Sequence, residues 1–531
     1  MLPKKVWKWL HWASLLFGIL LIVLGVVILS VAPHIIHEQI DEEAYLGRYP
    51  NGTYHKTVLK WISPKYEMFL QIWTFSVANA KQVMQFGDKP LVIEHGPYTF
   101  IEKQNKSWFQ FIRNDTRILY RNDRTYFFSQ KDSCKSCLLG DKVTVPNILF
   151  QKLVDILIDP STSTITRFAL ETLIGVSSET AYITVNVSDL LFDGYKDPLV
   201  QKICGKPIIS DICKKFGVPD RIGLFYGQNG TDDGVYEVNT GLEGIHSIGK
   251  VYSWNNMTGT LPKKYWYGDQ ARMINGSDGQ LFTPNLSPSD QIQVFSGKIC
   301  RSVCFEHNTD IELEGIPAYR FSPCTSMNDP LVQRTQGFCN PKSPVYFKNE
   351  SVQPVGCAPI SLMDVSSCMP SSPRIYISQP HFLDAPKEIH DAIQKLAPPT
   401  ENDRMFVDIE PSSGAPIRAN SVSQVNVGLL NGNLSFLKNM SNAIVPLLWL
   451  NETAMLDADT HDQLMTLVTA KRIYRIVSSL FLGFGVLLLL VFSIGIVANK
   501  YKTRNNEETD TLVENEQVQD PEEQAYGPIE S

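Results

Sequence analysis

The chain has 531 residues, of which 43% are hydrophobic and 19% are charged, a composition that is typical of folded proteins and sufficient for a large core. The formal net charge of -7 argues against a nucleic-acid partner, because domains that bind nucleic acid present a basic surface.

The first apolar segment spans residues 13–32 and contains no charged side chain. The apolar region of a signal peptide is about 7 to 15 residues long, whereas a membrane-spanning helix needs about 20. Although Ser30, Val31 and Ala32 resemble a cleavage site, the length favours a transmembrane helix that is retained. The lysines within residues 1–12, with acidic residues after the segment, predict a cytoplasmic N-terminus.

The segment 33–475 contains every Asn-x-Ser/Thr sequon of the chain. So many sequons confined to one segment predict a lumenal or extracellular region, an ectodomain, with glycans on its surface. The candidate glycosylation sites are Asn51, Asn105, Asn114, Asn186, Asn229, Asn256, Asn275, Asn285, Asn349, Asn433, Asn439 and Asn451.

All 10 cysteines also lie in the segment 33–475, which predicts disulfides in an oxidising compartment. Cys134 and Cys137 form a Cys-x-x-Cys pair, for which zinc is the alternative. Zinc would need a second ligand pair at a suitable spacing, and the nearest pair, Cys204 and Cys213, is poorly spaced. The remaining cysteines fall within residues 300–368 and predict a cysteine-rich submodule.

Residues 144–204 contain short helical patterns with apolar residues at i, i+3 and i+4. The patterns cover residues 145–158, 163–175 and 187–203, and prolines and glycines separate them. Two interpretations stay open: helices that pack only against one another, or a helical cap with an apolar outlet to solvent.

Strand composition marks residues 181–187, 374–382 and 423–430. Residues 222–241 carry two aromatic-rich arms around an Asn-Gly-Thr-Asp-Asp-Gly sequence, and we predict a β-hairpin there.

The second apolar segment, residues 476–498, is uncharged and long enough to span a membrane. The tail that follows, residues 499–531, is strongly acidic and is predicted to be a solvated cytoplasmic segment. Tyr526 and Ile529 within it fit the Tyr-x-x-apolar signal of clathrin adaptors, which predicts endocytosis and traffic between the plasma membrane and endosomes or lysosomes.

Signatures of enzymes are absent from the sequence: it has no Gly-x-Ser-x-Gly, no His-Glu-x-x-His and no Gly-rich phosphate or dinucleotide loop. The 10 histidines are scattered along the chain. We therefore predict no catalytic residue, no cofactor and no metal, and we expect that the protein is not an enzyme.

Seven ordered sequence blocks, together with the two apolar segments, resemble the class B scavenger receptor family, which includes fatty acid translocase, the high-density-lipoprotein receptor and the type-two lysosomal integral membrane protein. The blocks are HGPYTFIE (95–102), DGYKDPL (193–199), MINGSDGQLF (273–282), CRSVCFE with GIPAYRF (300–321), YISQPHFLDA (376–385), FVDIEPSSGAPI (406–417) and IVPLLWLNET (444–453). The resemblance covers the whole chain except the C-terminal tail.

The resemblance implies an α+β fold: a large, irregular antiparallel β-barrel ectodomain with an apical helical bundle, anchored by two transmembrane helices. The helical patterns in 144–204 match the position of that bundle. Both termini would be cytoplasmic, at the plasma membrane or in endosomes and lysosomes. The family also implies a hydrophobic tunnel through the ectodomain, along which lipid reaches the bilayer. Fatty acids, sterol esters, phospholipids or lipoprotein particles are then the expected partners, and homo-oligomerisation stays open.

The resemblance also implies two disulfides, Cys300 with Cys368 and Cys339 with Cys357. Cys304 and Cys324 flank one of the matching blocks and are expected to pair with each other. By proximity alone, we expect Cys204 to pair with Cys213 and Cys134 to pair with Cys137.

If the helical region captures lipid, its apolar residues are the expected contacts: Leu149, Phe150, Leu153, Leu157, Phe168 and Leu173. Ordinary helix packing is an equally good explanation for each of them. Some family members bind fatty acid through an apical lysine, but the matching stretch here, residues 175–180, has none, and Lys152 and Arg167 are the nearest basic residues. A neutral lipid is therefore a better expectation than a carboxylate.

Two further functions remain possible from the sequence. One is a lysosomal or endosomal transport or adhesion receptor for a protein client. The other is a ligand-gated channel, since Ser478, Ser479, Gly483, Gly485, Ser493 and Gly495 place small or polar residues in the second apolar segment.

Overall fold

The computed structural model describes residues 4–65, 68–175, 180–325 and 327–517. The chain divides into two compact units, which we describe separately. We call Ile40–Asp462 the sheet unit, and Met1–Gln39 with Gln463–Ser531 the helix unit.

Two helices are long and apolar enough to cross a membrane. They are α1 (Lys4–Ala44) and α9 (Ala458–Gln517), and their most apolar parts have a mean hydropathy of 3.1 and 2.8. The predicted spans, 13–32 and 476–498, lie inside them, and the sequence that resembles a cleavage site lies within continuous helix. The two helices fit a two-span membrane protein.

Inside the helix unit, α1 and α9 contact each other through small and aromatic residues. The rings of His11 and Phe492 lie 4.8 Å apart. A Cβ atom added to Gly18 would lie 3.1 Å from the carbonyl oxygen of Gly485. Glycine at both positions therefore lets the two backbones approach closely, as is common between membrane helices.

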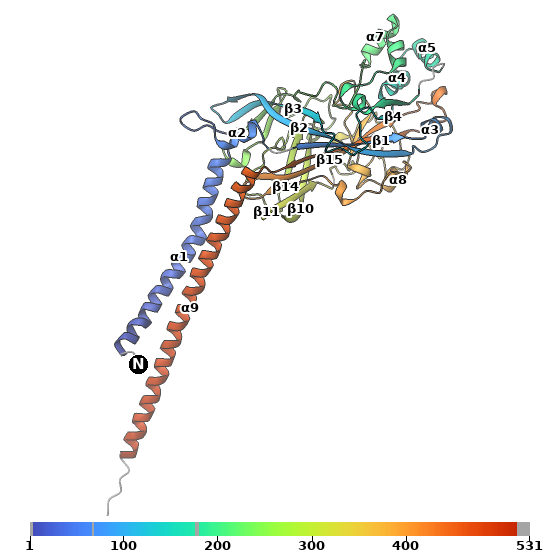
Figure 1. The fold of residues 1–531 in the computed structure, drawn as a ribbon. Coiled ribbons are helices and arrows are strands. Elements are labelled where there is room, and N and C mark those ends of the chain that lie inside the picture. Colours follow the sequence, from blue (N-terminus) through green and yellow to red (C-terminus); the bar gives the residue numbers. More distant parts are fainter. Residues whose placement is uncertain (1–3, 66–67, 176–179, 326, 518–531) are drawn as a thin grey trace, which may run out of the picture. The chain divides into compact units, whose positions relative to one another are not determined.

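The sheet unit is built on one 14-stranded antiparallel sheet (Figure 1). Its main order is β8-β7-β6-β3-β2-β1-β16-β15-β14-β11-β10-β9, with β13 and β12 attached to β15. The long strands are β1 (Met68–Val77), β2 (Val92–Ile112), β3 (Arg117–Phe128), β10 (Arg301–Leu313), β11 (Ile316–Pro323), β15 (Ala415–Leu429) and β16 (Ala443–Met455). The shorter strands are β6 (Tyr236–Asn239), β7 (Val251–Trp254), β8 (Met257–Thr258), β9 (Gln291–Ser296), β12 (Met363–Asp364), β13 (Ile375–Ser378) and β14 (Phe406–Glu410).

The ladder of this sheet has two free ends, β8 and β9, within the described residues. The expected β-barrel is therefore not confirmed by strand pairing. A large antiparallel sheet is present, and the helices of the unit lie outside it. Gly276 and Ser277 lie between the two sides of the ladder: the Val251 N–H donates to the Gly276 carbonyl (2.8 Å), and the Phe295 N–H donates to that of Ser277 (2.7 Å).

Helices gather at one end of the sheet unit, where Figure 1 labels α4, α5 and α7. We call α4 to α7, together with the antiparallel strand pair β4–β5, the helical group. It contains β4 (Lys142–Pro146), α4 (Ile148–Ile158), α5 (Thr164–Gly175), β5 (Tyr182–Asn186), the π-helical turn η1 (Asp189–Asp193), α6 (Pro198–Cys204) and α7 (Pro207–Lys215). The first two helical patterns of the sequence are α4 and α5, while the third is divided between η1 and α6.

The helices begin where the sequence provides caps. The Asn147 side chain accepts a hydrogen bond from the Phe150 N–H (3.1 Å), and the Asp197 side chain accepts one from the Val200 N–H (2.7 Å). Pro198 occupies the first turn of α6, where a missing N–H costs nothing. The Asn147 amide also donates to the Asp197 carboxylate, which joins the starts of α4 and α6.

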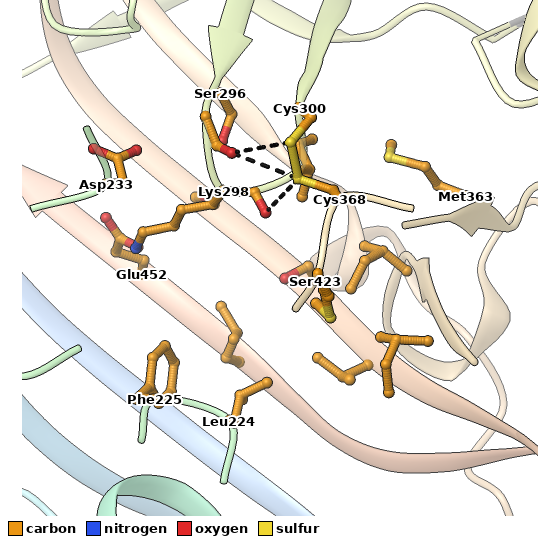
Figure 2. A pocket seen from close by; sticks show the side chains of 18 of the residues that line it. Leu224, Phe225, Asp233, Ser296, Lys298, Cys300, Met363, Cys368, Ser423 and Glu452 are labelled. Atoms are coloured by element: carbon orange, nitrogen blue, oxygen red, sulfur yellow. Dashed lines mark hydrogen bonds between the residues drawn. A yellow bond between two sulfur atoms is a disulfide. The ribbon is translucent and has the colours of Figure 1, made fainter. Parts of the chain in front are cut away.

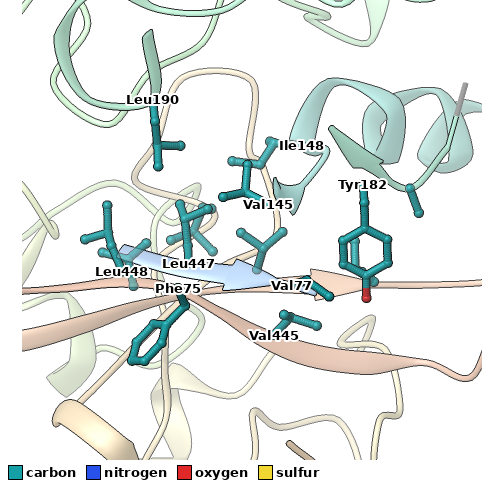
Figure 3. Close-up of a cluster of buried hydrophobic side chains, with 14 of the residues drawn as sticks. Phe75, Val77, Val145, Ile148, Tyr182, Leu190, Val445, Leu447 and Leu448 are labelled. Atoms are coloured by element: carbon teal, nitrogen blue, oxygen red, sulfur yellow. The ribbon is translucent and has the colours of Figure 1, made fainter. Parts of the chain in front are cut away.

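The helical group packs on the middle of the sheet. Figure 3 shows Leu447 of β16 beside Val145 and Ile148 of the helical group, with Leu190 above them. These side chains belong to one buried cluster that continues into β1 through Phe75. The core therefore connects the two ends of the sheet unit's sequence to the helices between them.

The remaining helices of the sheet unit are short. They are α2 (Lys56–Ile62), α3 (Ala80–Phe86) and α8 (Lys387–Asp391), with the single turns η2 (Ile245–Ser247), η3 (Gln270–Arg272), η4 (Gln336–Phe338), η5 (Pro380–Phe382), η6 (Glu401–Asp403) and η7 (Ser435–Leu437).

The predicted hairpin at 222–241 is wrong. Its second arm is β6, which pairs with β3 and β7. Its first arm instead follows η1: the Leu224 N–H donates to the Leu190 carbonyl (2.9 Å), and the Phe225 N–H donates to that of Leu191 (2.7 Å). The backbone groups that a hairpin would use are thus occupied by more distant partners.

Five disulfides lie in the sheet unit, and they are the pairs named in the sequence analysis. They join Cys134 to Cys137, Cys204 to Cys213, Cys300 to Cys368, Cys304 to Cys324 and Cys339 to Cys357.

A buried imidazole connects several parts of the sheet unit. His381 Nδ1 lies 3.0 Å from a carboxylate oxygen of Asp403, and its Nε2 lies 3.1 Å from one of Glu94. The Trp449 indole N–H donates to the other oxygen of Glu94 (2.7 Å), and the Trp449 ring stacks on Trp73. Burial alone would lower the pKa of His381, but the two carboxylates outweigh it and raise this pKa to about 9.

We therefore predict that the protein loses stability at alkaline pH through His381. The folded-state pKa, about 9, exceeds the ordinary value of 6.5, so this contribution is complete below about pH 6.5 and disappears as the pH rises through 9. The difference corresponds to at most about 3 kcal/mol, and to less where solvent screens the charges. Thermal unfolding of His381→Gln between pH 6 and 10 should lack this part of the decline. His390→Gln, at a half-buried histidine outside this cluster, should keep it. An alkaline decline that is equal in both variants would contradict the assignment.

Candidate functional site

A cavity of about 890 Å³ lies inside the sheet unit (Figure 2). Residues from β1, β3, β9, β13, β15 and β16 line it, together with the chain between η1 and β6. Its volume falls within the range of about 300 to 1,000 Å³ that is usual for small-molecule sites. The sheet thus surrounds a space large enough for a ligand with a hydrocarbon body.

Much of the cavity wall is apolar. Leu70, Val425 and Leu447 contribute from three neighbouring strands, and Figure 2 shows Leu224, Phe225 and Met363 around the same space. Side chains alternate between the two faces of a strand, so these strands present one apolar face to the cavity. Such a wall binds hydrocarbon through the hydrophobic effect, which is worth about 0.8 kcal/mol per buried CH₂.

One side of the cavity is charged. Figure 2 shows Lys298, Glu452 and Asp233 close together. Arg124 Nη1 lies 3.0 Å from a carboxylate oxygen of Glu452 and 3.2 Å from one of Glu102. We call these five residues the charged cluster.

Strand register brings the charged cluster together. Leu70 of β1 lies opposite Glu452 of β16, and Met68 lies opposite Glu102 of β2. Gln104, two residues after Glu102, lies opposite Arg124 of β3. Side chains on one face of a strand recur every two residues, so Glu102, Arg124 and Glu452 all project from the same face of the sheet. The Arg124 side chain therefore reaches from β3 to both carboxylates.

Burial sets the proton affinities of the charged cluster. Burial raises the pKa of Glu102, and the nearby Glu452 carboxylate raises it further. Burial would also raise the pKa of Glu452, but Arg124 and Lys298 outweigh it and lower this pKa. Burial lowers the pKa of Lys298, and the positive charge of Arg124 lowers it again. The cluster therefore combines one strongly paired arginine with a lysine whose charge is costly.

The predicted apical contacts divide into two sets. Leu149, Phe150, Leu153 and Leu157 are completely or almost completely buried in α4. Their positions are those of helix packing. Phe168 and Leu173 of α5 are 75% and 40% exposed, and Ile165, on the same helix, is 84% exposed. The surface-accessible part of the prediction is therefore on α5, and none of these residues lines the cavity.

The predicted apical cations are engaged within the helical group. Lys152 is buried, and its Nζ lies 3.4 Å from an Asp155 carboxylate oxygen. Arg167 donates to the Asp159 carbonyl (3.2 Å). Both are therefore occupied by partners of their own. Within the stretch 175–180, which matches the lysine-bearing stretch of some family members, residues 176–179 lie outside the described residues. The predicted sorting residues Tyr526 and Ile529 also lie outside them.

The sequon asparagines are accessible. Asn186, Asn275 and Asn451 are half-exposed, and the others are exposed. All twelve residues are at least partly exposed, although the Asn451 side-chain oxygen is buried, and glycosylation at these positions stays a prediction.

The resemblance implied an apolar tunnel through the ectodomain, but sequence reasoning missed the residues that line the cavity and its charged cluster. Glu102 and Glu452 belong to two of the blocks that carry the family resemblance, whereas Arg124 and Lys298 lie outside the blocks. The available signal was a glutamate inside an apolar strand, but its meaning depends on register, which the sequence does not give.

Comparisons with known proteins agree with the resemblance. A model of the CD36 family matches residues 16–496. Lysosome membrane protein 2 of Rattus norvegicus is 29% identical over 447 residues, which cover 83% of this chain and 86% of that protein. Scavenger receptor class B member 1 of Rattus norvegicus is 28% identical over 486 residues, which cover 91% of this chain and 89% of that protein.

We predict that removing the arginine of the charged cluster destabilises the sheet unit. Arg124→Met would leave two buried carboxylates without their cation, which typically costs about 3–5 kcal/mol. The matched control is Arg121→Met on the same strand, whose half-exposed side chain lies 3.5 Å from Asp232 and should contribute at most about 1 kcal/mol. Chemical denaturation of the two variants measures the difference. Equal losses in the two variants would contradict the role given to Arg124.

Proposed function

The chain belongs to the CD36 family, and from this premise we propose that it is a scavenger receptor that binds lipid in the cavity of its sheet unit and passes it to the membrane. The observation that carries the proposal is the 890 Å³ cavity with its largely apolar wall. A relative of this chain is named a scavenger receptor, which supports the receptor role.

An amphiphilic lipid suits both parts of the cavity. Its hydrocarbon would lie against the apolar wall formed by residues such as Leu447 and Val425, and its polar group would lie at the charged cluster, near Lys298. A hydrocarbon chain in water loses about 0.8 kcal/mol per exposed CH₂. An apolar path through protein removes this penalty without covalent chemistry, so the proposed function needs no catalytic residue.

We propose that lipid or lipoprotein is captured at the helical group. Ile165 and Phe168 lie three residues apart on α5 and are both strongly exposed, which gives one apolar helix face without a covering partner in the described residues. Exposed apolar faces of this kind are typical of interaction surfaces.

The proposed topology places residues 1–12 and 499–531 in the cytoplasm, with 33–475 on the opposite side of the membrane. The disulfides and the accessible sequons of the sheet unit support this orientation. Because Gly276 and Ser277 bridge the two sides of the ladder, we also propose that the sheet closes there as an irregular barrel around the cavity.

We propose the plasma membrane and the endosome–lysosome membrane as the locations, with clathrin adaptors as partners of the tail. The alternative is a lysosomal receptor for a protein client, which the similarity to lysosome membrane protein 2 keeps open. In that case the exposed face of α5 would bind protein, and the cavity would be secondary.

We predict that the full-length protein, purified in detergent micelles without added lipid, carries lipid in its cavity. Native mass spectrometry should find fatty acid, sterol ester or phospholipid on the folded chain, and the added mass identifies the class. Ser423→Phe should lose most of it, because the Ser423 side chain lines the cavity and phenylalanine would fill part of that space. The control Thr309→Phe, at an exposed position of β10, should retain it. A folded wild type that stays empty when lipid is offered would remove the transfer function.

We predict that Ile165→Asp with Phe168→Asp reduces capture of lipid particles by transfected cells while surface expression is unchanged. Two charges on the exposed face of α5 should prevent apolar contact without disturbing the core. Leu331→Asp with Val355→Asp is the matched control, since both of these side chains are also exposed. Unchanged lipid capture, together with loss of a co-purified lumenal protein, would favour the protein-client receptor.

A further inference from the structure

The Cys134–Cys137 disulfide lies close to two side chains outside the Cys-x-x-Cys motif. His95 comes from the distant strand β2, and Asp141 follows Cys137 by four residues. His95 Nε2 lies 3.9 Å from Cys134 Sγ and 3.7 Å from Cys137 Sγ. The same nitrogen lies 3.9 Å from a carboxylate oxygen of Asp141. The third ligand that a zinc site would need is thus supplied by His95 of β2 and not by another cysteine, and the Asp141 carboxylate lies next to this histidine.

The two distances from the His95 nitrogen to the cysteine sulfurs are those expected in a zinc site, whereas the distance between the two sulfurs is that of a disulfide. In tetrahedral zinc, with Zn–S about 2.3 Å and Zn–N about 2.0–2.1 Å, a nitrogen and a sulfur ligand lie about 3.6 Å apart. Both distances from His95 Nε2 to sulfur are close to this value. Among these three ligands, the two sulfur atoms, which are bonded to each other, lie too close together to share a metal ion.

Hydrogen bonds orient the aspartate, and the site is partly exposed on the side of His95 although Cys137 is buried. The Tyr98 hydroxyl and the Leu138 N–H both donate to Asp141 Oδ2, at 2.9 and 2.8 Å. Such outer hydrogen bonds orient ligands in metal sites. The side chains of His95 and Asp141 are 42% and 29% exposed, so an ion from solvent can reach them.

The turn does not depend on its disulfide for its position. The Cys134 N–H donates to the Pro97 carbonyl (2.9 Å), and Thr99 donates through its hydroxyl to the Asp132 carbonyl (2.8 Å). This disulfide also closes the shortest loop of the five, with a sequence separation of 3 against 9 to 68 for the others. A short loop restricts the unfolded chain least, so its reduction should cost the least stability.

We propose that Cys134, Cys137 and His95 form a redox-gated zinc site, with the Asp141 carboxylate beside the fourth position. A dithiol reductant gives two electrons to the disulfide, which becomes two thiols, while the reductant becomes a cyclic disulfide. Zn²⁺ then replaces the two thiol protons, which pass to solvent, and binds the two thiolates and the imidazole nitrogen. Thiolate and imidazole ligands are the set that zinc prefers. In the oxidised chain neither sulfur is a thiolate, so the site is closed.

The test uses the full-length protein in detergent micelles and Co²⁺ as a spectroscopic probe for zinc. The chain is treated with limiting dithiothreitol, freed of reductant without oxygen, and titrated with Co²⁺. We expect a thiolate-to-cobalt charge-transfer band that saturates at one ion per chain, disappears when Zn²⁺ is added, and is missing from the oxidised chain. Circular dichroism should show that the reduced chain stays folded.

Matched variants identify the ligands. Cys134→Ser with Cys137→Ser should give no band after the same treatment, and His95→Ala should weaken Co²⁺ binding more than about tenfold. Cys204→Ser with Cys213→Ser removes another short disulfide and should leave the band unchanged. The proposal is overturned if the reduced wild type unfolds or gives no band, if the band survives in the Cys134 and Cys137 variant, or if His95→Ala binds Co²⁺ as the wild type does.

Discussion

The pairing of β1 with β16 is the constraint on which the sheet unit depends. β1 is the first long strand of this unit and β16 is the last, yet they are neighbours in the middle of the sheet, from Met68 opposite Ala454 to Thr74 opposite Leu448. Because the pair is antiparallel, the start of β1 and the end of β16 lie side by side. Near this point Lys60 Nζ lies 3.0 Å from a carboxylate oxygen of Asp459. The first and last residues of the sheet unit's strands are therefore close in space although they are far apart in sequence.

The same pairing creates both the cavity and its charges. Placing β16 beside β1 brings Glu452 opposite Leu70, within reach of the Arg124 side chain from β3. Two strands from the ends of the unit thus supply one carboxylate and much of the apolar wall, and the strands added on either side supply the rest. Buried ion pairs seldom add much net stability compared with apolar packing. Their position makes one side of the cavity polar, while much of the remaining wall is apolar.

The sequence predicted what depends on local patterns and failed where distant residues meet. Length and charge identified the spans inside α1 and α9, and the apolar period identified α4. The hairpin at 222–241 failed because the backbone around Leu224 bonds to η1, a partner that no local pattern specifies. The resemblance implied an apolar tunnel, but the residues of the charged cluster were not predicted for the same reason: the face on which Glu102 or Arg124 projects depends on register, and register is set by the whole sheet.

The Cys-x-x-Cys turn is hydrogen-bonded to the base of the helical group, so a change at its disulfide would affect that region first. The Val187 N–H donates to the Asp141 carbonyl, and the Ser188 N–H donates to that of Leu139, both at 2.9 Å. Residues 187 and 188 lie between β5 and η1, and Asp141 is followed directly by β4, so the turn contacts both strands at the base of the helical group. Neither His95 nor the two cysteines line the cavity. Separation of the two sulfurs would therefore act first on the base of the helical group, and the cavity would respond only through the core that the helical group shares with the sheet.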